Sequence, residues 1–414
     1  MNRREFLSSA AIASAVTTAG CVDFSSGGSD TCSVDERQHE TDSPATGTFG
    51  DSTSETLNAS FHASQAVSDA SGSDVASGDI YWRTRFPGPP SGSAGVAIVG
   101  GTVCFGGERL YGVDQATGEV EWCRSPGIIR PSAPVLHEGT LIVGEKISPD
   151  EDGGVRALDP ASGDDRWRNT EVGSVGARPT VANGEVFLSG SIENQTISAV
   201  DLESGDLRWK ETVEGAARSP PVPSSETLLV RTESRLLAVD QADGSIEWQT
   251  DAGGSVRSPV VADGTVFTQT GPATFAALDA ATGDENWSVT NAEERDLDMH
   301  ACVDDETVYV ALTGEERDEV VALSRADGTE RWRKTAERTA SRYDVLGTPD
   351  SLFVASEDGM AALRTTDGTV RWSRGFPTRS DEDVVYSGTP AAFGVTSGAL
   401  YALTGSGDLF ALAR

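Results

Sequence analysis

The chain has 414 residues, and its 65 acidic side chains outnumber its 32 basic ones, which gives a formal net charge of −33 at pH 7. Such an acidic chain without a basic stripe is not expected to bind nucleic acid. Its five cysteines are too few and too scattered for a disulfide framework, so we expect buried free thiols in the folded part.

The first residues predict export. Arg3 and Arg4 precede a mildly apolar run over residues 10–19, which is too short for a transmembrane helix, and Cys21 follows Thr18-Ala19-Gly20. This arrangement resembles a twin-arginine export signal over residues 1–21 that ends in a lipobox, with Cys21 as the lipid attachment point. An ordinary cleaved signal with an incidental cysteine is the alternative, because Thr18 stands where a lipobox usually has leucine.

Residues 22–78 are rich in Ser, Gly, Thr and Asp, contain few large apolar side chains and show no periodicity. This composition predicts a disordered tether. Random-coil scaling gives such a segment a root-mean-square span of about 40 Å. We therefore expect the folded domain to stand off the membrane.

An internal repeat fixes the predicted architecture. The tryptophans recur at intervals of 39 to 45 residues, and a period near 40 with strand-like content is typical of a β-propeller. They are Trp82, Trp122, Trp167, Trp209, Trp248, Trp287, Trp332 and Trp372.

One repeat illustrates the predicted blade. Residues 179–182 and 186–189 are short apolar runs joined by Asn183-Gly184, a dipeptide typical of tight hairpins. Residues 196–200 and 206–210 predict a third and a fourth strand. Trp209 in the fourth strand can lie between adjacent blades, and we expect every tryptophan of the repeat to dock in this way.

The two ends of the repeat region complement each other. Residues 79–86 form an outer strand with no inner strands before it, whereas the segment after residue 388 supplies three strands without a fourth. We therefore predict an all-β domain over residues 79–414, an eight-bladed propeller of four-stranded antiparallel blades in which the N-terminal strand completes the last blade. Seven blades with a decorating strand is the alternative.

The phrase Ala-x-Asp-x-x-[Thr/Ser/Asp]-Gly-x-x-x-Trp occurs at 157–167, 199–209, 238–248 and 277–287. It resembles the repeat of pyrroloquinoline-quinone-type (PQQ-like) propellers. That superfamily includes quinoprotein alcohol dehydrogenases and non-catalytic, eight-bladed BamB-like lipoproteins. The length of the repeat region resembles the second branch, because the dehydrogenases carry long insertions that build a cofactor chamber.

The resemblance to the dehydrogenases implies a quinone held with Ca²⁺, a catalytic aspartate and often a disulfide between adjacent cysteines. This chain has no Cys-Cys pair, and its acidic runs at 150–153 and 296–298 are typical of a solvated surface. Met299, His300 and Cys302 are expected to be core and channel lining. We predict no catalytic residue, no metal and no cofactor, with PQQ and Ca²⁺ as the alternative.

An aspartate recurs just before the turn between the third and fourth strands, at Asp114, Asp159, Asp201, Asp240 and Asp279. Its carboxylate can accept hydrogen bonds from local backbone amides and so set the turn. Five equivalent copies indicate architecture rather than catalysis.

Arginines recur just before or at the start of the predicted inner strands, a position that clusters around one mouth of a propeller's channel. Such a positive annulus would bind carboxylate or phosphate groups of a ligand or partner. Pairing with carboxylates of neighbouring blades is the alternative. The arginines are Arg130, Arg178, Arg218, Arg257, Arg295 and Arg342, with Arg379 before the last blade.

Together these features predict a lipid-anchored, monomeric propeller on the outer face of the cytoplasmic membrane that acts as a protein-interaction or assembly scaffold. This function rests on the resemblance, because fold alone does not specify function. The alternatives are a quinone-dependent dehydrogenase and a small-anion receptor that uses the channel.

The charge also predicts dependence on salt. Only Lys146, Lys210 and Lys334 are lysines, and the acidic composition resembles that of proteins from extreme halophiles, of haloarchaeal type. The electrostatic screening length grows from about 3 Å at 1 M salt to about 30 Å at 0.01 M, so surface carboxylates repel one another in dilute buffer. We expect the melting temperature, followed by circular dichroism, to fall steeply on dilution; an unchanged value contradicts the halophilic interpretation.

Overall fold

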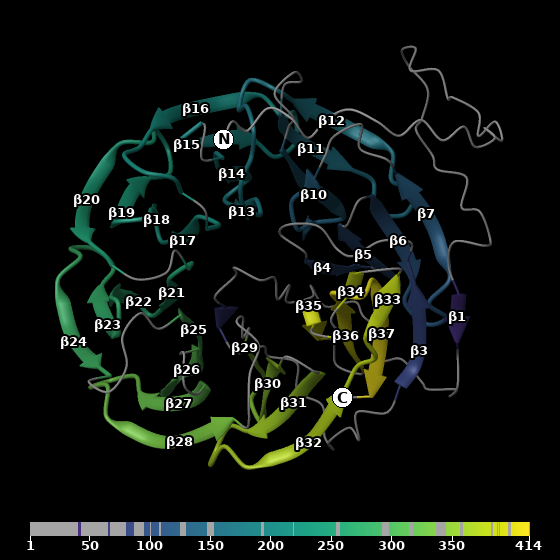
Figure 1. The fold of residues 1–414 in the computed structure, drawn as a ribbon. Helices are drawn as coiled ribbons and strands as arrows, with labels where there is room; N and C mark the ends of the chain where they lie inside the picture. The colour runs from purple at the N-terminus through teal and green to yellow at the C-terminus, as the bar shows by residue number, and fades with distance from the viewer. Residues whose placement is uncertain are drawn as a thin grey trace, which may run out of the picture.

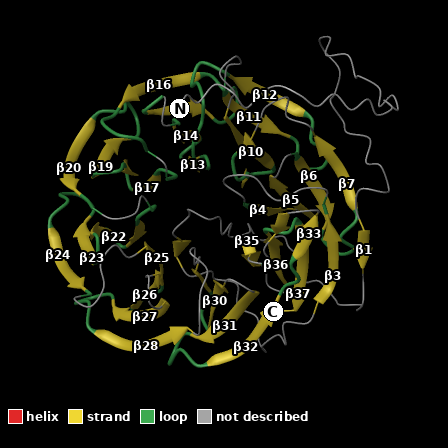
Figure 2. Cartoon of the chain, viewed as in Figure 1, coloured by secondary structure: helices red, strands yellow, loops and turns green. Residues whose placement is uncertain are grey.

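The described strands of the computed structural model form eight blades around a central channel, and no helix occurs among the described residues (Figures 1 and 2). This confirms the predicted eight-bladed, all-β fold. The structure describes residues 40–42, 65–66, 80–86, 95–99, 101–106, 109–124, 130–146, 153–191, 194–217, 219–253, 257–291, 298–313, 318–336, 345–356, 359–381, 384–386, 388, 390–395 and 399–413.

Within each blade the strands follow the chain from the channel outward. Blade 1 comprises β4 Val96–Val99, β5 Thr102–Gly106, β6 Leu110–Asp114 and β7 Val120–Arg124. In blade 2, β8 Arg130–Pro131 and β9 Val135–His137 both pair with β10 Thr140–Lys146, followed by β11 Gly154–Leu158 and β12 Asp165–Asn169. Blade 3 comprises β13 Thr180–Ala182, β14 Glu185–Ser189, β15 Thr196–Asp201 and β16 Leu207–Thr212. Blade 4 comprises β17 Val222–Ser224, β18 Thr227–Arg231, β19 Arg235–Asp240 and β20 Ile246–Asp251.

The second half of the ring repeats this order. Blade 5 comprises β21 Val260–Ala262, β22 Thr265–Gly271, β23 Thr274–Asp279 and β24 Glu285–Thr290. Blade 6 comprises β25 Asp298–Val303, β26 Thr307–Thr313, β27 Asp318–Ser324 and β28 Glu330–Ala336. Blade 7 comprises β29 Val345–Gly347, β30 Ser351–Ser356, β31 Gly359–Arg364 and β32 Val370–Gly375. A separate hairpin, β33 Arg379–Asp381 with β34 Val384–Tyr386, precedes blade 8.

The N-terminal strand closes the ring. Blade 8 contains β35 Pro390–Val395, β36 Ala399–Thr404 and β37 Asp408–Ala413, and β3 Ile80–Arg85 pairs antiparallel with β37 as its outer strand. Asp408 is fully buried and accepts hydrogen bonds from Arg83 Nη2 at 2.9 Å and from Arg85 Nε at 3.1 Å. The predicted closure is confirmed, and a buried ion pair joins the two ends of the domain.

The turns carry the residues that their conformations require. Asn183 and Gly184, between β13 and β14, have φ values of 53° and 77°, the left-handed pair of a type I′ hairpin turn. In the turn after β15, Asp201 Oδ1 accepts the amides of Glu203 at 3.0 Å and Ser204 at 2.8 Å. Gly205 then adopts a φ of 76°. The repeated aspartate of blade 3 therefore sets its turn.

Blades 6 and 7, which lack this aspartate, place one later in the same turn. Ser324 and Arg364 stand at the usual position. Asp327 Oδ1 accepts the amide of Thr329 at 3.1 Å, and Asp367 Oδ1 accepts that of Thr369 at 2.9 Å. In both blades an aspartate carboxylate therefore still accepts a backbone amide of the turn, although this aspartate stands later in the turn than the repeated one.

Each outer-strand tryptophan lies opposite a small residue of the third strand. In blade 3 Trp209 is paired with Ala199, and the register shifts directly after this pair. In blade 1 the partner of Trp122 is Gly112, where an added Cβ would lie 2.2 Å from the indole. The repeat phrase therefore has alanine at this position because the indole ring packs across it and leaves no room for a larger side chain.

Seven tryptophans donate an indole hydrogen bond to the turn of the next blade. Trp167 Nε1, for example, donates to Leu202 O over 2.9 Å, and an added Cβ at Gly205 would lie 2.5 Å from the same ring. The pairs are Trp82–Gln115, Trp122–Pro160, Trp167–Leu202, Trp209–Gln241, Trp248–Ala280, Trp287–Arg325 and Trp332–Thr365.

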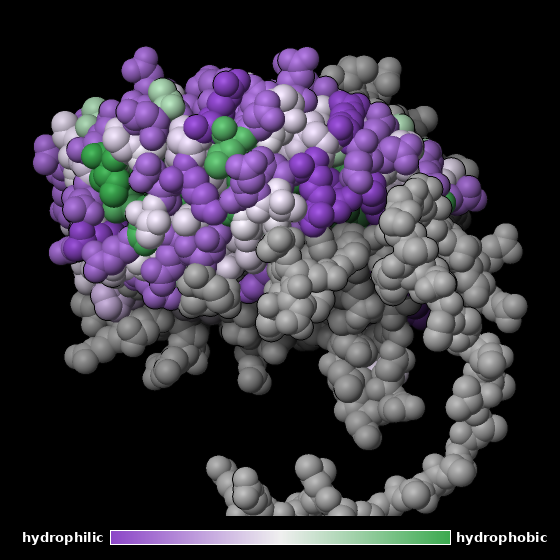
Figure 3. All heavy atoms as spheres, turned by 90° about the horizontal axis from the view of Figure 1, so that it is seen from above, coloured by the Kyte–Doolittle hydropathy of each residue, from purple (hydrophilic) through white to green (hydrophobic). Residues whose placement is uncertain are grey.

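The hydrophobic core is divided into eight clusters, one between each pair of neighbouring blades. The cluster between blades 8 and 1 contains Trp82, Phe86, Phe105, Tyr111 and Tyr401. Seen edge-on, the described surface is mainly hydrophilic with isolated apolar spots (Figure 3). A blade therefore buries its apolar side chains only by stacking on its neighbours.

Two short segments within the predicted tether pair with the propeller. β1 Glu40–Asp42 lies antiparallel along β3, and β2 Gln65–Ala66 lies parallel to the inner strand β25. The prediction of an unstructured tether over residues 22–78 therefore fails at these two places. The rest of that range, and the signal with Arg3, Arg4 and Cys21, lie outside the described residues.

The cysteines correct a second expectation. Cys104 and Cys302 are buried and free, as expected, and Cys104 is not bonded to Cys123. Cys123, however, is disulfide-bonded. The expectation of free thiols was therefore wrong for Cys123.

We expect the turn glycine beneath a tryptophan to tolerate no side chain. Gly205→Ala and Gly184→Ala both place alanine at a φ near 76°, at a cost of about 1–2 kcal/mol. Nothing lies within 4 Å of an added Cβ at Gly184, whereas Trp167 blocks it at Gly205. Urea unfolding at high salt should show about 1–3 kcal/mol of additional loss for Gly205→Ala; equal losses would show that the indole contact contributes nothing.

Candidate functional site

The structure places only part of the predicted arginine annulus. Arg178 and Arg257 are half-buried and lie a few residues before the inner strands β13 and β21. Arg130 lies in β8 with its backbone opposite Lys146.

The remaining candidate arginines do not extend this group. Arg218, Arg295 and Arg342 lie outside the described residues. Arg379 lies in β33, in a hairpin that belongs to no blade. The annulus therefore remains a prediction.

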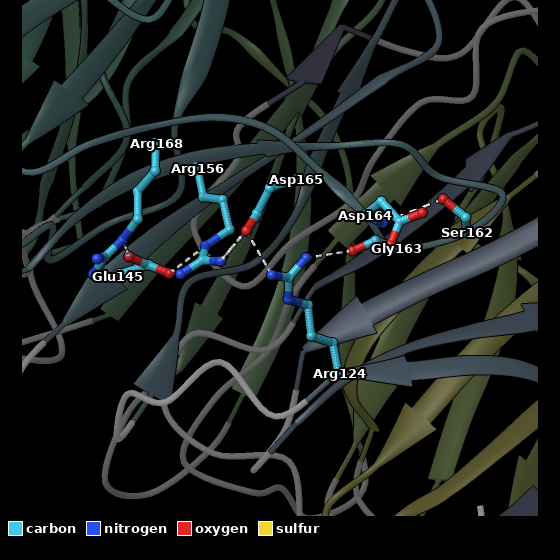
Figure 4. A network of polar contacts seen from close by, with 8 residues as sticks. All are labelled: Arg124, Glu145, Arg156, Ser162, Gly163, Asp164, Asp165 and Arg168. Atoms are coloured by element: carbon cyan, nitrogen blue, oxygen red, sulfur yellow. Dashed lines mark hydrogen bonds and ion pairs between the residues drawn. The ribbon is translucent and has the colours of Figure 1, made fainter. Parts of the chain in front are cut away.

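A network of arginines and carboxylates connects β7 of blade 1 with β10, β11 and β12 of blade 2 (Figure 4). Glu145 is buried and accepts hydrogen bonds from Arg156 Nε at 2.7 Å and from Arg168 Nε at 2.9 Å. Arg156 also contacts Asp165 at 2.7 Å. Arg124 of blade 1 reaches the same Asp165 at 2.6 Å. The network therefore links the two blades.

The electrostatics of this network favour fixed charges. Burial alone would lower the pKa of Arg156, but the negative charges of Glu145 and Asp165 and the hydrogen bonds to both outweigh it, so the pKa is raised. Arg156 therefore stays protonated and holds both carboxylates. This arrangement stabilises the joint between blades and offers no group for proton transfer.

A cavity of about 500 Å³ lies between blades 5 and 6. Its wall is mainly apolar and includes Phe275, Met299 and Leu312, and its polar end carries Glu319 and Arg333. Glu319 is buried and forms an ion pair with Arg333. One ion pair in an apolar wall can orient a small molecule but supplies no nucleophile.

The sequence candidates Met299, His300 and Cys302 do not come together. Met299 packs in the cluster between blades 5 and 6, whereas Cys302 packs in the cluster between blades 6 and 7. Across the described residues, no three His, Cys, Asp or Glu side chains form a group that could hold a metal ion. We derive no chemistry through a quinone.

Two adjoining depressions of about 740 and 520 Å³ lie over blades 5 to 7, on the face that carries the turns after the inner and the third strands. We call them the turn-face groove. Both depressions include Asp305, Glu306, Arg325 and Arg331. The half-buried rings of Trp287 and Trp332 line one depression each.

The charged groups of the groove differ in how firmly they are held. Arg325 is 13% exposed and donates to Asp263 Oδ2 at 2.5 Å and to Asp305 O at 3.1 Å. Arg331 is 40% exposed and contacts Glu306 at 3.3 Å. Arg325 is thus fixed at the floor, whereas Arg331 remains available to another molecule.

A buried phenol stiffens the groove. Tyr309 OH donates to Asp304 Oδ2 at 2.7 Å. Burial, together with the hydrogen bond and charge of Asp304, raises the pKa of Tyr309, so the hydroxyl stays protonated. Aromatic edges, arginines and fixed carboxylates in a preformed depression are suited to binding a polypeptide, because Trp, Tyr and Arg dominate the binding energy of protein interfaces.

Sequence reasoning missed this groove. Its tryptophans were expected to dock between blades, and Arg331 directly precedes one of them, as Arg166 and Arg208 do in other repeats. The available signal was the acidic run Asp304-Asp305-Glu306, which replaces the Asn-Gly type of turn between the first two strands. The depression itself depends on how three blades meet, which no single repeat encodes.

No described helix is long and apolar enough to cross a membrane. The chain belongs to the PQQ_2 family, described as "Outer membrane protein assembly factor BamB", which matches residues 63–193, 193–300 and 292–414. This confirms the resemblance to PQQ-like propellers. A comparison with curated protein sequences finds no match.

Solved structures with the same fold come from proteins of different roles. BamB from Moraxella catarrhalis is 16% identical with a TM-score of 0.58, over 77% of this chain and 96% of its own. The quinohemoprotein alcohol dehydrogenase from Comamonas testosteroni is 12% identical with a TM-score of 0.58, and the match covers 87% of this chain and 76% of the dehydrogenase. The computationally designed Ika8 protein is 12% identical with a TM-score of 0.61, and the match covers 77% of this chain and 95% of the designed protein. At these identities the likeness shows the fold alone.

The turn carboxylates predict sensitivity to acid. Hydrogen bonds from the Ser204 amide and from Arg208 lower the pKa of Asp201 to about 2. A lowered pKa stabilises the fold above the unfolded value near 4, and this stabilisation is lost as the pH falls through about 2. We expect Asp201→Asn to lower the free energy of unfolding by about 0.5 kcal/mol at pH 7 and by less at pH 2. The effect is small because solvent screens the carboxylate.

The control for this variant is Asp206→Asn. It removes the same charge from the same turn, but Asp206 accepts only the hydroxyl of Ser204. Thermal unfolding between pH 7 and pH 2 should show a pH-dependent difference for Asp201→Asn and a smaller one for the control. Parallel pH profiles for both variants would contradict the assigned role of Asp201.

Proposed function

We propose that this protein is a lipid-anchored, extracytoplasmic scaffold that binds a protein partner at the outer face of the cytoplasmic membrane. Membership of a family described as an outer membrane protein assembly factor supports a role in assembly. The acidic composition resembles that of haloarchaeal proteins, whose cells have a single membrane. We therefore carry over the scaffold role but not the outer membrane.

The turn-face groove is the observation on which this proposal depends. It combines the edges of Trp287 and Trp332 with the exposed Arg331 on a surface fixed by Arg325 and Tyr309. A rigid surface of this kind loses little conformational entropy on binding. The described residues of the groove hold their charges in ion pairs and hydrogen bonds, so the groove is suited to recognition rather than to proton transfer.

The location rests on the N-terminal sequence. Arg3 and Arg4 would direct export of the folded propeller, and a lipid on Cys21 would retain it at the surface. A large ring that folds before export suits a route for prefolded proteins. The described surface seen in Figure 3 is mainly hydrophilic, and we assign retention at the membrane to the lipid.

The test is crosslinking in intact cells at native salt, followed by affinity purification and mass spectrometry. We expect one partner protein crosslinked to residues of the turn-face groove. Arg331→Glu should reduce its recovery about tenfold, because the reversed charge faces the partner at the groove. Circular dichroism establishes that the variant is folded.

Arg166→Glu is the matched control. Arg166 also directly precedes a tryptophan, is 41% exposed and pairs with a carboxylate, Asp159, but it lies on blade 2. Equal loss in both variants would show that general charge, not the groove, recruits the partner. A propeller that purifies alone and absorbs like a bound quinone would overturn the scaffold in favour of a quinone-dependent enzyme.

A further inference from the structure

The cavity between blades 5 and 6 coincides with a departure from the repeat in the outer strand of blade 5. Two residues after seven of the repeat tryptophans the chain carries a polar or charged side chain, whereas after Trp287 it carries Val289. The seven are Thr84, Arg124, Asn169, Glu211, Thr250, Lys334 and Arg374. Val289 is half-buried and is paired with Phe275 of β23, and both side chains line the cavity. Blade 5 therefore presents an apolar outer edge to blade 6 at this place.

The arginine–carboxylate network between blades 1 and 2 occupies the corresponding place in another joint of the ring (Figure 4). The strand registers, counted from the repeat tryptophan of each blade, align the network with the wall of the cavity. Three charged side chains then have aliphatic counterparts, which are Val289 for Arg124, Leu312 for Glu145 and Val321 for Arg156. Two keep their charge, Arg333 for Arg168 and Glu330 for Asp165. The cavity therefore replaces a network of ion pairs and is not a general consequence of the repeat.

The cavity has the size and the wall of a small-molecule site. Its volume is about 500 Å³, within the range of about 300–1,000 Å³ that is usual for ligand pockets. Phe275, Met299 and Leu312 line it, are buried and belong to the core cluster between the two blades. Because these side chains are held by packed strands, the wall is preformed and loses little conformational entropy on binding.

The charges at the polar end of the cavity do not balance. Glu319 lines the cavity, is 5% exposed and forms an ion pair with Arg333. The same guanidinium donates to Glu330 Oε2, from Nε at 3.2 Å and from Nη2 at 2.8 Å. One cation is thus shared by two carboxylates, of which Glu330 is exposed to solvent and Glu319 is buried. A buried carboxylate whose counterion is shared is stabilised by a second cation that donates hydrogen bonds to it.

We propose that this cavity binds a small amphipathic amine, whose ammonium group pairs with Glu319 and whose apolar body packs against Phe275 and Val289. A protonated amine supplies the missing positive charge, whereas a carboxylate would add a third negative charge at the same end. The proposal goes beyond the scaffold function and does not depend on it, because the described linings of the cavity and of the turn-face groove share no residue.

Equilibrium dialysis of the full-length protein at molar salt, with phenylbutylamine as the probe, tests the proposal. Phenylpentanoate is the matched probe, because it carries a carboxylate on the same apolar body. We expect the amine to bind at least about tenfold more tightly than the carboxylate. Screening over about 3 Å at 1 M salt weakens attraction to the exposed acidic surface, so a preference that persists there reports a buried partner. Equal binding of the two probes, or no binding of the amine, overturns the proposal.

Two charge variants locate the amine. Glu319→Gln keeps the size of the side chain and should weaken binding of phenylbutylamine about tenfold, because the charged acceptor is lost. Glu330→Gln is the matched control, since Glu330 holds the same Arg333 but is exposed and does not line the cavity. It should change the affinity less than about twofold. Equal losses in the two variants would show that the net charge of the protein, not the cavity, attracts the amine.

A third variant tests the cavity itself. Ala273 lines the cavity and is 9% exposed, so the larger side chain of Ala273→Leu takes up part of its volume. This variant should lose most of its binding of phenylbutylamine although Glu319 is intact, and circular dichroism establishes that it is folded. A folded Ala273→Leu protein that binds the amine as the original does would place the amine outside the cavity and contradict the proposal.

Discussion

The indole of the outer-strand tryptophan is the contact on which the ring depends. Seven of the eight indoles lie against their own third strand, beneath the turn glycine of the next blade, and donate to a carbonyl of that turn. Because a blade cannot bury both faces alone, this contact fixes the angle and spacing between neighbours. The other three constant residues of the repeat serve this contact: the alanine makes room for the ring, the aspartate sets the turn, and the glycine lies over the ring.

The last joint of the ring cannot use the same contact. Blade 8 has no turn between its third and outer strands, because β37 ends at Ala413 and β3 begins at Ile80. Trp372 of blade 7 therefore has no equivalent turn to meet. Asp408 provides another connection: it is fully buried and pairs with Arg83 and Arg85 from the opposite end of the domain. A buried charge with two partners specifies one register for β3, since a slipped strand would leave the carboxylate unpaired.

The sequence predicted what local patterns determine. The period of the tryptophans, the Asn183-Gly184 dipeptide and the incomplete blades at both ends led to the ring, its strand order and its closure. The pairing of β1 and the hairpin β33–β34 were not predicted, because these segments carry no repeat pattern. The turn-face groove was missed for another reason: its depth depends on the relative positions of three blades, and its side chains have ordinary repeat positions.

The acidic surface also constrains how a partner can be recognised. Several arginines, including Arg156 and Arg325, are already bonded to carboxylates of this chain. At the molar salt that the acidic composition predicts, screening would limit electrostatic attraction to a few ångströms, so charge would not guide a partner from a distance. Recognition must then come from short-range contacts on a preformed surface. A depression that offers two indole edges beside an exposed arginine meets this requirement, whereas the predicted positive annulus depends on charge attraction, which the same salt would screen.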